Sequence, residues 1–534
     1  MIRRGIAAAF ALTIASTVAA QTQPLVDPPL RQALAARVES AMFPTLVAGI
    51  IDGDRQEIVS FGPANGETIY EIGSVTKTFT ALVLADAVER GEVKLDTPVQ
   101  QLLPGWTIPK SITLLDLATQ SSGLPRLPEN LMPKNPADPY ADYTIADLKS
   151  FLASFHPASA PGTHYEYSNV GFGLLGEALA QNEGMSYADL VRARVTGPLA
   201  MRDTVVDLTP EMTRRFAEGH APTGQAVGPW HFPALAGAGA LRSTAHDLII
   251  YLQSMMHPGK AAALATEPRR GTDQPNVRIA LAWQIDSRHG APVVWHNGMT
   301  GGSAAFVGFS GDRAAVVLTN VSHDVTDIGF ALLGVPGVAL APLRNEVTLP
   351  AGVLAEYAGR YRLAANVDLV VTIAGGGLQV QLTGQGALPV FASAKDEFFY
   401  KAVNAQLSFH RDASGKVDSV TLHQNGRDLN APRVTSEAPP PAERKEIHLD
   451  PATLAEYAGR YTLAPGFGLT VTEEGGQLYV QATAQPRLPV YTSARDEFFY
   501  KVVDAQLSFE RDATGKVVAV VLHQNGRDLR GSKE

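Results

Sequence analysis

The sequence predicts an α+β domain with a mostly antiparallel sheet and a helical subdomain, followed by two small antiparallel β-barrels. Three observations support this fold class. Strand-like segments lie at both ends of the first 345 residues, with helical segments between them. The rest of the chain contains one strand-rich module twice. At 534 residues the chain is also longer than one hydrophobic core usually supports.

The first region, residues 21–345, is predicted to be a single α+β domain. Segments that favour strands open and close it, whereas segments with helical periodicity fill the middle. Antiparallel strands from both ends that bracket helices indicate one sheet with a mostly helical insertion. The expected strand segments are Leu46–Asp52, Gln56–Phe61, Ile279–Ile285, Val293–Phe309 and Ala314–Asn320.

The C-terminal third repeats itself with a constant offset of 100 residues. Leu354–Tyr361 recurs unchanged as Leu454–Tyr461, and two further segments recur with the same offset. A constant offset means that one module occurs twice without insertions. We place the two copies at residues 346–435 and 449–534. The Pro-rich segment 436–448 between them is expected to be an extended linker.

Each copy of the module consists of short strands. Leu369–Ile373 and Leu378–Leu382 flank Gly375–Gly377, a pattern that predicts a hairpin. Closing the sheet removes its exposed edges, so we expect each copy to form a small antiparallel barrel. The repeated His423 and His523 are interpreted as structural. The barrels also offer surfaces for oligomerisation.

The first 20 residues have the three parts of an export signal. Arg3 and Arg4 precede a short apolar run, and Val18–Ala20 forms a cleavage site of small residues. The apolar run is too short to span a bilayer. We therefore expect cleavage near Ala20 and export to the periplasm or the extracellular space; the alternative is an N-terminus that is disordered or acts as an anchor.

Composition and charge exclude several function classes. The net charge is −9 and no cluster of Lys and Arg is present, which argues against a nucleic-acid partner. The absence of cysteine excludes disulfides, thiolate metal sites and a cysteine nucleophile. No segment after the N-terminus is apolar for long enough to span a membrane. Motifs for zinc, nucleotide or α/β-hydrolase chemistry are also missing, so we expect no metal and no cofactor.

The segment Glu71–Gly91 carries the first catalytic candidates. It is apolar around most of a helical circumference, which is typical of a helix buried inside a domain. Ser74 and Lys77 are three residues apart, so their side chains can meet at the N-terminus of this helix, where the Ser74 N–H is free to bind an oxyanion. Burial can lower a lysine pKa by about three units and so make it a base. Ser-x-x-Lys alone is also compatible with an exposed cap and a solvated lysine.

Gly73–Ala81 resembles the nucleophile helix of class C β-lactamases, DD-peptidases, D-aminopeptidases and family VIII carboxylesterases. These penicillin-recognising hydrolases pair that helix with a Tyr-x-Asn element, which Tyr167-Ser-Asn169 matches. The resemblance implies a β-lactamase/DD-peptidase-like fold for the first domain. It implies that Tyr167 relays a proton between Ser74, Lys77 and the leaving group, and that Asn169 orients Lys77 and the substrate.

The third element of this family lies on a strand beside the cleft, and His296-Asn297-Gly298 matches it. The resemblance implies that a cationic His296 holds a substrate carboxylate, that Asn297 and Gly298 border the substrate, and that the Met299 N–H is the second oxyanion donor. His replaces the usual Lys, and Asn the usual Thr. This histidine resembles the peptidases of the family more than the class C β-lactamases.

The resemblance implies a serine hydrolase that forms an acyl-enzyme at Ser74 on a small peptide or acyl substrate. We expect peptide amide bonds, either in D-amino-acid-containing or in cell-wall-derived peptides, as in DD-carboxypeptidases or D-aminopeptidases. In the D-aminopeptidases, barrel loops narrow the active site. A β-lactamase, a carboxylesterase and a non-catalytic penicillin-binding or ligand-binding protein remain alternatives. Whether Lys77 or Tyr167 is the general base stays open.

Overall fold

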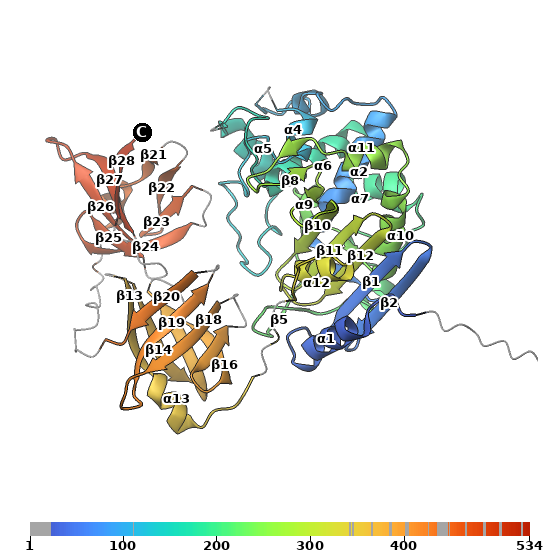
Figure 1. The fold of residues 1–534 in the computed structure, drawn as a ribbon. Helices are drawn as coiled ribbons and strands as arrows, with labels where there is room; N and C mark the ends of the chain where they lie inside the picture. The colour runs from blue at the N-terminus through green and yellow to red at the C-terminus, as the bar shows by residue number, and fades with distance from the viewer. Residues whose placement is uncertain are drawn as a thin grey trace, which may run out of the picture.

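The computed structural model describes residues 23–534 except 110–111, 158, 341–342, 344–345, 365–366, 384–386, 401–404, 425–426, 435–446, 448, 465–466, 484–486, 501–504 and 525–526. The predicted signal peptide at residues 1–20 therefore lies outside the described residues, as does most of the predicted linker at 436–448. Figure 1 shows an α+β domain with two β-barrels beside it. The predicted fold class is confirmed.

The first domain is built on an eight-stranded sheet with the order β2-β1-β12-β11-β10-β9-β8-β7, in which neighbouring strands are antiparallel. Strands from both ends of the domain lie side by side, as predicted, because β1 pairs with β12. The strands are β1 (Leu46–Asp52), β2 (Arg55–Phe61), β7 (Arg270–Gly271), β8 (Val277–Ile279), β9 (Gln284–Asp286), β10 (Val293–Met299), β11 (Ala304–Ser310) and β12 (Arg313–Thr319).

Two of the expected strand segments are interrupted. Ile279–Ile285 contains the end of β8, a tight turn in which Ala282 has φ +65°, and the start of β9. Val293–Phe309 contains β10, a turn, and most of β11. Its turn lies at Thr300–Ser303, where the Thr300 N–H donates to the Ser303 carbonyl.

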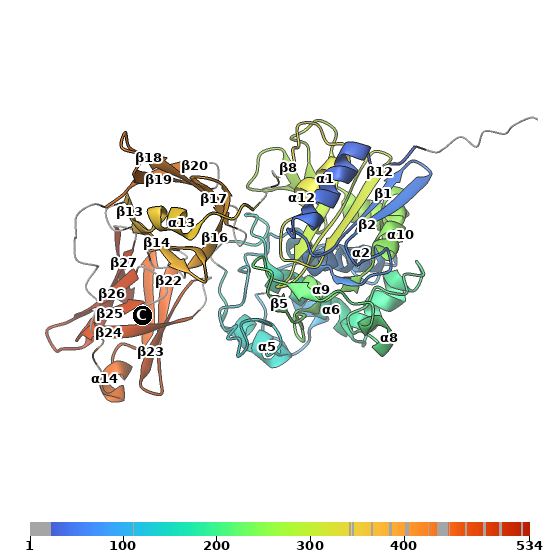
Figure 2. The same cartoon turned by 90° about the horizontal axis from the view of Figure 1, so that it is seen from below.

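Both faces of the sheet are covered. Along β1, Leu46, Ala48 and Ile50 pack with α1 and α12, whereas Val47 and Ile51 face the helices of the other side. Figure 2 shows α1 and α12 on one face of the sheet and α10 on the other. These helices are α1 (Pro28–Glu39), α10 (Ala245–Met256) and α12 (Thr326–Leu332).

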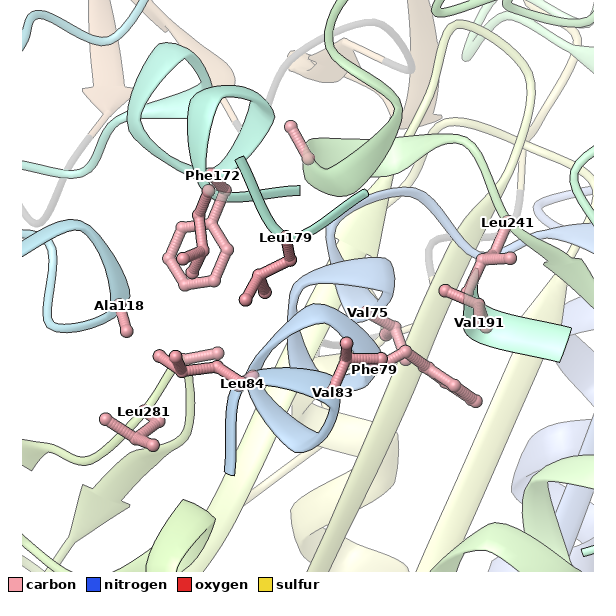
Figure 3. Packing of buried hydrophobic residues seen from close by; sticks show 14 of the residues in the cluster. Val75, Phe79, Val83, Leu84, Ala118, Phe172, Leu179, Val191, Leu241 and Leu281 are labelled. Atoms are coloured by element: carbon pink, nitrogen blue, oxygen red, sulfur yellow. The ribbon is translucent and has the colours of Figure 1, made fainter. Parts of the chain in front are cut away.

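The helical subdomain surrounds α2, which is buried along most of its length. Val75, Phe79, Val83 and Leu84 point from this segment into apolar side chains of several neighbouring elements (Figure 3). The elements of the region are a 3₁₀ turn (Gly73–Val75), α2 (Thr76–Glu89), α3 (Val99–Leu102), α4 (Leu114–Ala118), α5 (Ile145–Ser154), α6 (Asn169–Asn182), α7 (Tyr187–Val191), a π-helical turn (Arg192–Thr196), α8 (Pro210–Thr213), α9 (Ala236–Gly239) and α11 (Lys260–Thr266), with short strands β3 (Tyr70–Glu71), β4 (Gly219–His220), β5 (Ala226–Val227) and β6 (Arg242–Ser243).

Each C-terminal module forms eight strands that pair in sequence order. The second closes through the pairs Tyr461–Lys533 and Thr462–Ser532, and in the described residues of the first a bridge joins Tyr361 and Arg433. The first contains α13 (Ala351–Tyr357), β13 (Gly359–Ala364), β14 (Val367–Ala374), β15 (Gly377–Leu382), β16 (Leu388–Ala394), β17 (Glu397–Tyr400), β18 (Ala405–Arg411), β19 (Val417–Gln424) and β20 (Arg427–Pro432). The second contains α14 (Pro451–Ala455), β21 (Gly459–Ala464), β22 (Phe467–Glu474), β23 (Gln477–Ala482), β24 (Leu488–Ala494), β25 (Glu497–Tyr500), β26 (Ala505–Arg511), β27 (Val517–Gln524) and β28 (Arg527–Lys533).

The second barrel contacts the first domain through strand β23. The Gln481 side-chain Nε2 donates to the Glu129 carbonyl over 2.7 Å. This contact comes from a strand residue, so the narrowing of the active site by barrel loops stays a prediction. Within the described part of the chain, no helix has both the length and the apolar character that crossing a membrane requires.

Candidate active site

Ser74 lies in a 3₁₀ turn, Gly73–Val75, that leads directly into α2. The side chain is partly exposed while its neighbours Gly73 and Val75 are buried. Two glycines bring strand β10 against this turn. A Cβ at Gly73, whose φ is +48°, would lie 2.7 Å from the Met299 nitrogen, and a Cβ at Gly298 would lie 2.7 Å from the Ser74 nitrogen. The backbone amides of Ser74 and Met299 are therefore neighbours, as an oxyanion site requires.

Lys77 is fully buried and its Nζ makes three hydrogen bonds. It donates to Ser74 Oγ over 2.9 Å, to Asn169 Oδ1 over 2.9 Å and to the Ala238 carbonyl over 2.7 Å. Burial, with a smaller contribution from the charge of Arg126, holds the pKa of Lys77 well below its usual value. No carboxylate of the described residues forms an ion pair with Lys77 that would oppose this shift. A neutral Lys77 beside Ser74 is suited to accept its proton.

Tyr167 is the second group beside Ser74. Its phenol lies near enough to the Ser74 side chain to be affected by it, and the Lys77 Nζ lies 4.9 Å from the centre of its ring. Burial raises the pKa of Tyr167, although the Ser74 side chain and the charge of Arg126 act in the opposite direction. The phenol therefore stays protonated at neutral pH. Of the two candidate bases, these shifts favour Lys77 and leave Tyr167 as a proton donor.

The Tyr-x-Asn element is fixed by its position at the start of α6. Ser168 caps the helix, since its Oγ accepts the Gly171 N–H over 2.8 Å. The Ser168 N–H in turn donates to Gln120 Oε1 over 2.7 Å. Gln120 has φ +55°, a strained conformation for a residue with a side chain. The side-chain amide of the next residue, Asn169, bridges two groups. Its Oδ1 accepts from Lys77, and its Nδ2 donates to the Tyr140 hydroxyl over 3.1 Å.

His296 faces the same cluster, with its ring centre 6.4 Å from that of Tyr167. Only 1% of the residue is exposed. Burial first, and then the charge of Lys77, lower the pKa of His296 to about 3. The Nδ1 lies 2.5 Å from the Asn297 carbonyl, which can only accept, so Nδ1 carries the proton and Nε2 is an acceptor. In the free protein this imidazole is therefore neutral at physiological pH, and the binding of a substrate carboxylate by a cationic His296 stays a prediction.

The structure corrects the role expected for the Asn297 side chain. Successive residues of a strand point to opposite faces, and Asn297 lies on the face turned towards α12. Its Nδ2 donates to Thr326 Oγ1 over 3.0 Å and lies 3.4 Å from Asp324 Oδ1. The Asn297 amide thus anchors β10 to the start of α12 and does not point to Ser74.

Glu71, which the sequence did not single out, links the loops around the nucleophile. This buried carboxylate accepts the Thr300 hydroxyl and the Trp230 N–H, each over 2.7 Å. The Arg242 guanidinium lies 3.9 Å away. Thr300 follows Met299 directly, so Glu71 holds the turn that carries the second amide. The only sequence signal for this role was the position of Glu71 three residues before Ser74.

A second set of serine, histidine and aspartate residues lies on each barrel. In the first, His423 Nε2 is 3.0 Å from Ser408 Oγ and its Nδ1 is 2.7 Å from Asp428. The Ser408 hydroxyl, however, donates to Glu397 over 2.7 Å, and the Asp428 side chain is 74% exposed. A catalytic serine needs its proton directed to the base, so this arrangement supports the structural interpretation of the histidine.

Comparison with known proteins shows which family the chain belongs to. A family model described as "Beta-lactamase" matches residues 30–332, more than half of the chain. The chain belongs to the beta-lactamase family. A second model, described as "Domain of unknown function (DUF3471)", matches residues 343–433 and again residues 443–533. The two successive matches agree with the duplication read from the sequence.

Several beta-lactamase family members are similar to this chain. The beta-lactamase of Escherichia coli K12 is 29% identical over 255 residues, which cover 46% of this chain and 64% of that protein. The D-alanyl-D-alanine-carboxypeptidase/endopeptidase AmpH of the same organism is 28% identical over 255 residues, 44% of this chain and 64% of AmpH. The chain thus spans less than two thirds of these two relatives. Penicillin-binding protein 4* of Bacillus subtilis 168 is 23% identical over 416 residues, 71% of this chain and 90% of that protein.

A solved class C beta-lactamase superposes with a TM-score of 0.51 at 22% identity, over 58% of this chain and 96% of that one. At this identity the similarity concerns the fold alone. It supports the β-lactamase-like architecture of the first domain.

Proposed function

We propose that this protein is a serine acyl-hydrolase that works through an acyl-enzyme at Ser74. One observation carries the proposal: a fully buried lysine, without a carboxylate partner among the described residues, lies 2.9 Å from a partly exposed serine hydroxyl. Burial lowers the pKa of Lys77 and so favours the neutral amine, and a neutral amine in hydrogen-bond contact can remove the serine proton.

In the proposed cycle, Lys77 accepts the Ser74 proton as Oγ attacks the substrate carbonyl carbon. The Ser74 and Met299 N–H groups bind the negative oxygen of the tetrahedral intermediate. Tyr167 gives its proton to the leaving group and is reprotonated from Lys77. Water then attacks the acyl-enzyme as Lys77 removes its proton, and Lys77 returns this proton to Ser74 Oγ as the acid is released.

We propose peptide amide bonds as the substrate class, in peptides with D-residues or derived from cell wall. The relative named D-alanyl-D-alanine-carboxypeptidase/endopeptidase supports this class, and the relatives named beta-lactamase support β-lactam hydrolysis equally. Ester hydrolysis uses the same nucleophile and remains a further candidate. Turnover of a D-Ala-D-Ala peptide, a D-aminoacyl anilide, nitrocefin and a p-nitrophenyl ester would rank these activities.

Intact-mass measurement after treatment with a penicillin or a fluorophosphonate tests the central step. The wild type should gain the mass of one acyl or phosphonyl group, and Ser74→Ala should gain none. Ser60→Ala, which removes an exposed hydroxyl from β2, is the matched control and should label like the wild type. Labelling of Ser74→Ala to the wild-type extent would contradict the proposal. If Ser74→Ala still binds penicillin and the wild type turns over no substrate, the protein is a binding protein instead.

A further inference from the structure

In the free protein, neither Lys77 nor His296, the two basic side chains described beside Ser74, can bind an anionic substrate as a cation. Lys77 is buried, and its three hydrogen bonds go to protein groups. His296 is neutral and presents an unprotonated Nε2. A carboxylate placed beside this imidazole would meet a lone pair rather than a donor.

Arg126 supplies the missing charge at the edge of the site. It is exposed, and its guanidinium carbon lies 5.1 Å from the centre of the Tyr167 ring. Within the described residues, no carboxylate forms an ion pair with this guanidinium. Arg270 of the same domain, in contrast, is paired with Asp116 at 2.9 Å. Arg126 is therefore a free cation next to the proposed proton donor.

The backbone of Arg126 is held against the Tyr-x-Asn element. Its carbonyl accepts the Asn169 N–H over 3.0 Å. The carbonyl of the preceding Pro125 accepts the Ser168 hydroxyl over 2.7 Å. Two hydrogen bonds thus hold the backbone at Pro125 and Arg126, and this places the Arg126 side chain beside Tyr167. A rigid support of this kind is what a specificity residue needs.

The charge of Arg126 also acts on the catalytic groups. It contributes to the lowered pKa of Lys77, and it opposes the effect of burial on the pKa values of Tyr167 and Tyr140. These effects agree with the short distance to the Tyr167 ring. They also mean that a substitution of Arg126 changes the protonation of Lys77 for every substrate, so an experiment must separate this general effect from substrate binding.

We propose that Arg126 binds a carboxylate on the leaving-group side of the substrate, and thereby selects peptides with a free C-terminal carboxylate next to the scissile bond. The side follows from Tyr167, which protonates the leaving group and over whose ring Arg126 lies. A guanidinium forms two parallel hydrogen bonds with a carboxylate and keeps its charge at every physiological pH. This inference rests on the acyl-hydrolase function proposed above.

The test compares a peptide that ends in D-Ala-D-Ala with the same peptide as its C-terminal amide. In Arg126→Met, kcat/KM for the free carboxylate should fall about 10- to 100-fold relative to the amide, the range for a lost charged hydrogen bond. Arg126→Lys should retain part of the preference. Arg202→Met, at another exposed arginine, should retain all of it. The ratio between the two substrates cancels the change in Lys77.

The pH dependence provides an independent readout. In the wild type the preference for the carboxylate should stay constant between about pH 6 and pH 9, because arginine does not titrate there. A preference that disappears through the titration range of histidine would overturn the proposal.

Two further outcomes distinguish a failure of this inference from a failure of the proposed hydrolase function. If both peptides are cleaved in a Ser74-dependent reaction and Arg126→Met leaves their ratio unchanged, Arg126 has no such role, although the hydrolase function stands. If the wild type shows neither turnover nor acylation at Ser74, the proposed function is wrong and this inference with it. Fluorophosphonate labelling of Arg126→Met confirms that the variant is folded and competent.

Discussion

Substitution of Gly298 by alanine should inactivate the enzyme through the backbone of strand β10. The new Cβ would lie 2.0 Å from the Ile72 carbonyl oxygen, 2.7 Å from the Ser74 nitrogen and 2.9 Å from the Val75 nitrogen. Ordinary contact begins near 3.4 Å, so the strand and the nucleophile turn must separate by about 1.4 Å. All three contacts are with backbone atoms, which cannot rotate away as a flexible side chain could. The Met299 amide moves with the strand.

A displacement of this size affects activity more than folding. Misplacement of a catalytic group by about 1 Å can cost about 10²-fold in rate, and loss of one oxyanion donor costs about 10²- to 10³-fold. Overpacking typically destabilises a protein by about 1–3 kcal/mol. We therefore expect Gly298→Ala to fold, with kcat/KM lower by about 100-fold or more.

The assay measures the rate of acylation with an activated ester together with thermal unfolding. Gly228→Ala is the matched control, because a Cβ there meets no atom within 4 Å and its φ is not in the left-handed region. It should behave as the wild type in both measurements. Gly298→Ala with a wild-type acylation rate would refute the assignment of an oxyanion site between Ser74 and Met299.

Three further predictions follow from the same site. Lys77 becomes neutral as the pH rises, and burial lowers its pKa, so kcat/KM should increase from acid pH and reach its plateau below about pH 10. Lys77→Met should lose nearly all activity and, with it, this rise of kcat/KM with pH. Tyr167→Phe should slow turnover of an amide about 10²- to 10⁴-fold but affect a p-nitrophenyl ester less, since that leaving group needs no proton; equal losses would contradict the role of proton donor. If the N-terminal segment is an export signal, the mature secreted protein should begin near Gln21, which N-terminal sequencing or intact mass would show.

The sequence predicted those features that depend on short distances along the chain. Ser74 and Lys77 meet because residues three apart share one side of a helical segment, and the structure places them 2.9 Å apart. The duplicated barrels followed from the constant offset of the repeat. Tyr167 and Asn169 required resemblance to a family, because 90 residues or more separate them from Lys77 and no periodicity connects the two elements.

Other features depend on packing that the sequence does not express. The charge of His296 depends on how completely β10 is covered, and the sequence alone does not distinguish a neutral imidazole from a cationic one. The direction of Asn297 follows from strand alternation once His296 is known to face inward. Arg126 comes near Tyr167 because the hydrogen bond from the Asn169 N–H to the Arg126 carbonyl joins its loop to the start of α6, 43 residues further along the chain.

Burial is the largest cause of the pKa shifts of Lys77, Tyr167 and His296, so one structural feature controls all three protonation states. One part of this burial is the close contact between β10 and the turn before α2, which Gly73 and Gly298 permit. A variant that separates the two elements should admit water to Lys77 and raise its pKa towards the usual value. The residual activity of Gly298→Ala should therefore have its acid limb displaced to higher pH. An acid limb at the wild-type position would show that the contact orients the oxyanion donors but does not exclude water from Lys77.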